Sequence, residues 1–333
     1  MHQADWIGPR LTPWEDGYPA AAVVPAGFAA YARVLHPAGT GGNEDRPVRW
    51  AEVAAWSGLP LRPDAQFHSV ALPPTDPGGP PPYRHDPWEG GLDEPDAAVL
   101  AGIVRDWTAT PEDCWFCVWD GYGWGSGVPL VAVDHSGRPL GAVPPPPTDP
   151  VPGPVRSGPR VELPHRSYLL YQGPAKAALA LAALDGTHGQ CPNLWWPADR
   201  AWCVASEIDL PWTYVGGPRG LIDAILADDR IEALPTAPDD PVSRVEDWVA
   251  AWVDQLYEDL MAQGTASLST SLGAVDARLR RSGRIRSGNL HIDVTGHRGG
   301  FSSSGSTLGG GEEIIRSSVL AYLTQAVLRL TGT

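Results

Sequence analysis

Apolar residues recur at intervals of three and four between residues 242 and 261, and acidic residues occupy the opposite side. This period matches one face of an α-helix, so the stretch predicts an amphipathic helix. Similar spacing predicts helices over residues 49–56, 93–107, 174–184, 219–227 and 312–330. In the second of these, Asp93 is placed to cap the helix and Pro95 to occupy its first turn.

A strict alternation of residue types follows the aromatic run at 193–196, with a proline- and aspartate-containing turn at 197–200 between them. This order predicts an antiparallel strand pair, because successive side chains on a strand point to opposite faces. We expect one set of side chains to face the core and the other to face mostly solvent. The core-facing set is Trp202, Val204, Ser206 and Ile208, and the solvent-facing set is Cys203, Ala205, Glu207 and Asp209.

Strands are also predicted within 23–36, at 114–119, at 166–172 and at 290–294. Together the elements indicate an α+β fold, with mostly antiparallel sheets and helices packed on one face. We expect two packed modules, at 1–141 and 160–263, joined by a proline-rich linker at 142–159. Residues 264–333, rich in serine and glycine before a terminal helix, are predicted to form a C-terminal appendage.

The chain has 333 residues, of which 43% are hydrophobic and 19% charged, which is typical of a folded protein. Its formal net charge of −15 argues against general binding to a phosphate backbone, so a nucleic-acid partner is not expected. Neither a signal peptide nor an apolar run of membrane-spanning length is evident, so we expect no membrane association and a cytoplasmic location.

Five blocks of the sequence carry a resemblance. They are WIGPR (6–10), VPAGFAAYARVLHPA (24–38), CWFCVWDGYGW (114–124), LPHRSYLLYQGP (163–174) and PNLWWPADRAWCVASEID (192–209). With these blocks, residues 1 to about 260 resemble a family of uncharacterised proteins of GC-rich actinobacteria. The resemblance implies no activity, cofactor or site residue.

The four cysteines include a Cys114-x-x-Cys117 pair, which could indicate a redox pair or half of a zinc site. On a strand, however, these two side chains point to opposite faces. We therefore predict buried free thiols, with no metal and no cofactor.

Three carboxylates are candidates for catalysis: Asp120, Glu207 and Asp209. The last two project from one strand face at a spacing that could suit paired-carboxylate chemistry, although a solvated polar face is the commoner meaning of the pattern. Candidates for binding are Tyr122 and Trp124, which lie between glycines in a loop, and Arg200 at the end of the 197–200 turn.

An arginine cluster at Arg278, Arg280, Arg281, Arg284 and Arg286 could contact an anionic partner or neutralise the acidic surface. The leading hypothesis is a non-enzymatic interaction protein, one form of which is an acidic inhibitor or immunity-type partner of a basic protein. The alternatives are a hydrolase or transferase with an acidic, aromatic-lined small-molecule pocket, and an assembly protein that oligomerises through its terminal helix.

Overall fold

The structure is a computed structural model. It describes residues 3–14, 18–41, 46–71, 79–122, 149–184, 189–242, 247–270, 273–282, 287–296 and 299–307. The chain divides into two compact units, of which the first comprises Met1–Trp50, Arg62–Asp64 and Tyr83–Val242. The second comprises Ala51–Leu61, Ala65–Pro82 and Ser243–Thr333.

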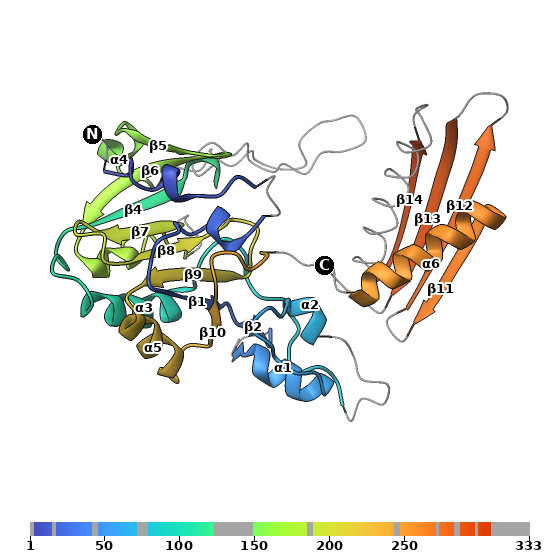
Figure 1. Cartoon of the computed structure of the whole chain (residues 1–333), viewed down its shortest axis with the longest axis horizontal. Coiled ribbons are helices and arrows are strands. Elements are labelled where there is room, and N and C mark those ends of the chain that lie inside the picture. The colour runs from blue at the N-terminus through green and yellow to red at the C-terminus, as the bar shows by residue number, and fades with distance from the viewer. Residues whose placement is uncertain are drawn as a thin grey trace, which may run out of the picture. The chain divides into compact units, whose positions relative to one another are not determined.

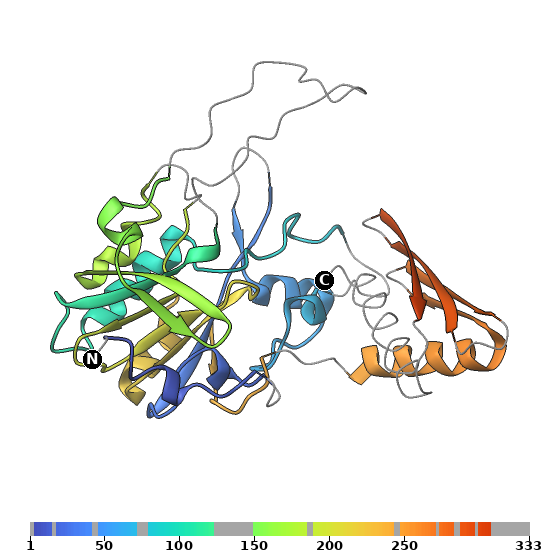
Figure 2. The same cartoon turned by 90° about the horizontal axis from the view of Figure 1, so that it is seen from above.

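An eight-stranded antiparallel sheet organises the first unit, in the order β10-β1-β9-β8-β7-β4-β6-β5 (Figures 1 and 2). Helices accompany it, which confirms the predicted α+β class. The sheet takes β1 and β4 from the predicted 1–141 module and its other strands from the 160–263 module, so the structure places both modules in one sheet. The strands are β1 (Ala30–Leu35), β4 (Cys114–Trp119), β5 (Arg160–Leu163), β6 (Arg166–Gly173), β7 (Leu194–Pro197), β8 (Cys203–Ser206), β9 (Trp212–Gly217) and β10 (Ala233–Thr236).

Helices α3 (Glu94–Arg105) and α5 (Arg219–Ala227) cover one face of this sheet, as Figure 1 shows. Both were predicted, and the Asp93 carboxylate accepts a hydrogen bond from the Asp96 N–H at 3.1 Å as an N-cap does. The predicted helix at 174–184 is instead a 3₁₀ helix, η4 (Ala175–Leu179). The buried layer between helices and sheet includes Leu100, Val104, Phe116, Trp195, Val204, Val215 and Ile222.

The opposite face of the sheet carries the N-terminal segment. The Trp6 ring meets those of Trp196 and Phe28 edge to face, each at a centroid separation of 6.2 Å. The predicted pairing of β7 with β8 is confirmed. The predicted exposure of one side of the strand after the turn is wrong, because the N-terminal segment covers that face and Cys203, Ala205 and Glu207 are buried. A sheet covered on both faces buries both sets of alternating side chains.

The smaller elements of the chain complete the first unit and begin the second. Helix α1, predicted at 49–56, is present and ends before Gly58, whose φ of +75° is the usual left-handed stop. These elements are η1 (Gly8–Arg10), η2 (Ala20–Ala22), β2 (Ala38–Gly39), β3 (Pro47–Val48), α1 (Trp50–Ser57), α2 (Phe67–Val70), η3 (Asp120–Tyr122) and α4 (Gly153–Arg156).

The second unit contains α6 (Asp247–Gln263), which confirms the longest predicted helix, followed by four antiparallel strands in sequential order. They are β11 (Thr265–Thr270), β12 (Gly273–Ser282), β13 (Ser287–Gly296) and β14 (Gly299–Thr307). Val253, Leu256 and Leu260 of α6 are buried. The predicted terminal helix at 312–330 lies outside the described residues, and among those described no helix is long and apolar enough to cross a bilayer.

Candidate functional site

Arg166, the first residue of β6, draws together two of the three predicted carboxylates. Its Nη2 lies 2.5 Å from Oε1 of Glu207 and 3.3 Å from Oδ2 of Asp209. The Glu207 side chain is 5% exposed and that of Asp209 is 74% exposed, so one partner is buried and the other faces water. One arginine and two carboxylates carry a net charge of −1 when all are ionised.

Burial sets the electrostatics of this cluster. Desolvation raises the pKa of Glu207, and the hydrogen bond and charge of Arg166 act in the opposite direction. Desolvation, followed by the nearby Glu207 charge, also raises the pKa values of Tyr18 and Tyr168 above the usual range. Both phenols are therefore neutral hydroxyl groups beside a carboxylate.

Two indoles flank the Arg166 guanidinium, whose Cζ lies 5.0 Å from the ring centroid of Trp14 and 5.8 Å from that of Trp119. Trp14 in turn packs on the imidazole of His165, with ring centroids 4.6 Å apart. The site thus holds a cation between aromatic faces, and the cation belongs to the protein itself.

The turn that places His165 is conformationally unusual. Leu163 pairs with Arg166, so Pro164 and His165 form a two-residue connection between β5 and β6. Proline suits the first central position of a type II turn, whose second central residue needs a positive φ. His165 has φ 65°, a conformation that costs a non-glycine residue about 1–2 kcal/mol. Tyr18, which also neighbours Glu207, has φ 45°, so two such residues lie beside the cluster.

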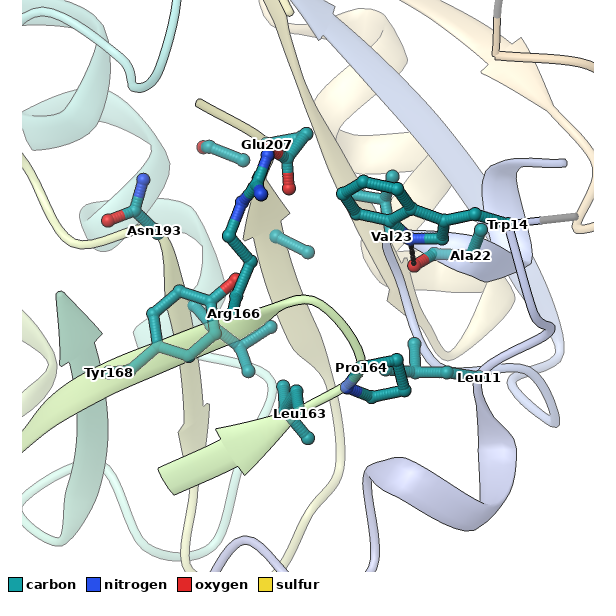
Figure 3. Close-up of a pocket in the computed structure, with 13 residues that line it drawn as sticks. Leu11, Trp14, Ala22, Val23, Leu163, Pro164, Arg166, Tyr168, Asn193 and Glu207 are labelled. Carbon is teal, nitrogen blue, oxygen red and sulfur yellow. Dashed lines mark hydrogen bonds and ion pairs between the residues drawn. The ribbon is translucent and has the colours of Figure 1, made fainter. Parts of the chain in front are cut away.

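A small pocket opens between this cluster and the N-terminal segment (Figure 3). Its polar lining comes from Glu207, Arg166, Tyr168, Asn193 and Ser206, and its apolar lining includes Leu11, Trp14, Val23, Leu163 and Leu194. The space open to the centre of a water molecule is about 20 Å³. One water needs roughly 10–15 Å³ by that measure, so the enclosed part holds a single small group.

Tyr168 is the polar residue of this pocket that lacks a protein partner. Tyr168 is 7% exposed, and its hydroxyl makes no hydrogen bond with the described part of the chain. Figure 3 shows the hydroxyl end of the ring directed toward Arg166. The hydroxyl of a largely buried tyrosine normally finds a partner, and this one lines the pocket, so it is available to a ligand or a water.

A second feature lies beside Asp209. Trp88 is 66% exposed, the most exposed large hydrophobic side chain among the described residues. Two residues further on, the Gly90 N–H donates to the Leu210 carbonyl at 3.2 Å, which sets residues 88–90 alongside 208–210. Partial burial, then the charges of Asp209 and Asp86, raise the pKa of Glu89. The exposed Trp88 thus belongs to a segment that also carries Asp86 and Glu89 and lies alongside the one that carries Asp209; we call these four residues the Trp88 surface.

The backbone of Trp88 is fixed from beneath by His36. The carbonyl of Trp88 can only accept, so Nδ1 of His36 donates to it at 2.6 Å. Nε2 then accepts from the Thr213 hydroxyl at 2.9 Å, and Thr213 accepts from Ser206 at 2.6 Å. Complete burial lowers the pKa of His36 to about 4, so the ring is neutral at ordinary pH.

The other predicted site residues lie elsewhere. Asp120 bridges Arg156 (2.7 Å) and Arg160 (2.8 Å) and does not join Glu207. The Tyr122 hydroxyl is used within the fold. It accepts a hydrogen bond from Asn193 Nδ2 at 2.8 Å and donates one to the Gly90 carbonyl at 3.2 Å.

Arg200 lies in the turn between β7 and β8, with φ 57° and its Cζ 5.7 Å from the ring of Trp6. Arg278 is exposed on β12, and Arg280 and Arg281 lie on the same strand. Trp124, Arg284 and Arg286 lie outside the described residues.

The four cysteines are buried free thiols, as predicted. Burial raises the pKa of each, for Cys114 and Cys191 to about 12, which suppresses the reactive thiolate. Over the described ranges, no group of three or more histidine, cysteine, aspartate or glutamate residues is arranged to hold a metal ion.

Sequence reasoning missed Arg166, Tyr168, His36 and Trp88 as site residues. Trp88 carried a usable signal, since a tryptophan between acidic residues in a proline- and glycine-rich stretch (DPWEGG) is well placed for exposure. Comparison of the chain with protein-family models, with curated proteins and with solved structures found no match. The function is therefore argued from the site.

Proposed function

We propose that this protein is a non-enzymatic interaction module that binds a basic segment of a partner protein at the Trp88 surface. The observation that carries the proposal is the 66% exposure of Trp88 beside the carboxylates of Glu89 and Asp209. Tryptophan is enriched among the residues that dominate binding energy at protein interfaces. An indole that stays in water among acidic groups suits a partner that brings apolar surface and positive charge together.

Electrostatics supports the same partner. The chain carries a formal net charge of −15, which steers basic proteins toward it. Within the described residues Glu89 forms no ion pair, and Asp209 contacts only Arg166, so both carboxylates retain acceptor capacity.

The backbone at this surface is preorganised. His36 and the Gly90 to Leu210 hydrogen bond hold the segment from both sides, so little backbone freedom is lost on binding. The proposal includes a cytoplasmic location, because four free thiols suit a reducing compartment.

The test is titration calorimetry of the full chain with synthetic peptides of equal length that are basic, neutral or acidic. We expect the basic peptide to bind, with an affinity that falls as salt rises. Trp88→Ala should weaken binding about tenfold or more, and Asp209→Asn should weaken it less.

Trp107→Ala is the matched control, because Trp107 is a 37% exposed indole that follows α3 and is not part of the Trp88 surface. It should leave the affinity unchanged. Equal affinity for basic and acidic peptides, or equal losses from the two tryptophan variants, would overturn the proposal.

A further inference from the structure

The pocket beside the Trp88 surface has a lining that matches one kind of side chain. Its polar groups come from Glu207, Arg166, Tyr168, Asn193 and Ser206, and the rest of its lining is apolar, including Leu11, Val23 and Leu163. Figure 3 shows this division, with Pro164 and Leu11 facing the Glu207 and Tyr168 side. A long aliphatic stem with a charged tip fits such a lining, because the stem packs on apolar surface while the tip meets polar groups.

The charge of the cluster decides the sign of the ligand. Glu207 and Asp209 together outweigh Arg166 by one negative charge, and Arg166 already contacts both. One added cation makes the cluster neutral, whereas one added anion would double its negative charge. The ligand group is therefore a monocation.

Size and hydrogen bonding then separate the two common cations of proteins. The enclosed space of about 20 Å³ accommodates a group the size of one water. A lysine ammonium is such a compact group and has three donors, whereas a guanidinium is a wide planar fork. The Glu207 carboxylate and the unpartnered Tyr168 hydroxyl supply acceptors for two of those donors.

We infer that this pocket receives the ammonium group of a lysine side chain from the partner, with Glu207 and Tyr168 as its acceptors. The inference rests on the proposed function and adds a residue-specific subsite to it. Arginine would be confined to the open Trp88 surface, so the two basic residues of a partner would bind in different places.

The experiment compares lysine-rich and arginine-rich peptides of equal length and charge by titration calorimetry against the full chain and Tyr168→Phe. That substitution removes a hydroxyl without a protein partner, so the fold should be unaffected. We expect lysine-peptide affinity to fall about tenfold or more, the loss of one hydrogen bond to a charged group. Arginine-peptide affinity should stay unchanged.

Tyr171→Phe is the matched control on the same strand. The Tyr171 hydroxyl donates to the Ala177 carbonyl at 3.3 Å on the helix-covered side of the sheet. Its loss should lower stability and leave both affinities unchanged.

The outcomes separate the two proposals. If neither basic peptide binds better than an acidic one, the proposed function fails and the pocket inference fails with it. If both basic peptides bind but Tyr168→Phe does not selectively weaken the lysine peptide, the lysine pocket alone is overturned.

Discussion

Two arginine–carboxylate clusters of the first unit use the same residue types with different balance. Arg156 and Arg160 face Asp120 and Asp149, so two positive charges meet two negative ones. Arg166 faces Glu207 and Asp209 alone, which leaves one negative charge over. The first cluster is complete by itself, and the second gains from an added cation. This difference is why we propose the second cluster as the place for a ligand.

Burial differs between the clusters in the same way. All four side chains of the balanced cluster are 27–36% exposed, so water screens their charges. In the unbalanced cluster Glu207 is 5% and Arg166 16% exposed, so each depends on the other for compensation. Removing an arginine from each cluster should therefore lower the free energy of unfolding by unequal amounts.

The largest effect is expected from Arg166→Met, which leaves the buried Glu207 carboxylate without its partner. Removing one member of a buried pair costs about 3–5 kcal/mol of unfolding free energy. Urea denaturation at pH 7 measures it. Adding Glu207→Gln to the same chain should recover most of the loss, because the uncompensated charge is removed. A single variant as stable as the wild type would mean that water already compensates Glu207.

A smaller effect, of opposite sign in the two clusters, is expected from pH. Burial raises the pKa of Glu207 above 4.5, so the folded state holds its proton longer than the unfolded state. Its contribution to stability is therefore greatest at low pH and declines as pH rises from 4.5 through the folded value. The hydrogen bond from Arg156 lowers the pKa of Asp149 below 3.8, so its contribution is present above 3.8 and is lost as pH falls through the folded value.

Unfolding free energies from pH 2 to pH 7 for the wild type, Glu207→Gln and Asp149→Asn measure this contrast. Each difference from wild type isolates one carboxyl group. Two differences with slopes of the same sign would contradict the contrast.

The smallest effect is expected from Arg156→Met in the balanced cluster. Partly exposed ion pairs contribute about 0–1 kcal/mol, so this variant should unfold within about 1 kcal/mol of the wild type. A loss equal to that of Arg166→Met would remove the distinction between the clusters.

The sequence was sufficient for elements that depend on local pattern. The Asp93-capped helix, the helix at 219–227 and the pairing of β7 with β8 follow from period, capping and turn chemistry. It was insufficient where one segment covers another: Glu207 was expected to face solvent because nothing local shows that residues 3–14 and 18–28 lie over that face.

The site itself depended on strand order. Arg166 and Glu207 lie on elements separated by β4 and β7 in the sheet, an arrangement that alternation alone does not reveal. Glu207 and Asp209 were predicted as a pair, and both do contact the same residue, Arg166. The sequence indicated only that Arg166 belongs to a strand.

The exposure of Trp88 has an optical consequence. Of the 15 tryptophans in the chain, Trp50, Trp195, Trp196, Trp202 and Trp212 are almost fully buried, whereas Trp88 is 66% in water. Buried indoles emit at shorter wavelengths and are shielded from dissolved quenchers, so among the tryptophans whose exposure the structure describes Trp88 should contribute most to the red edge of the emission spectrum. The residue proposed to bind the partner is thus also an intrinsic fluorescent label for the binding event.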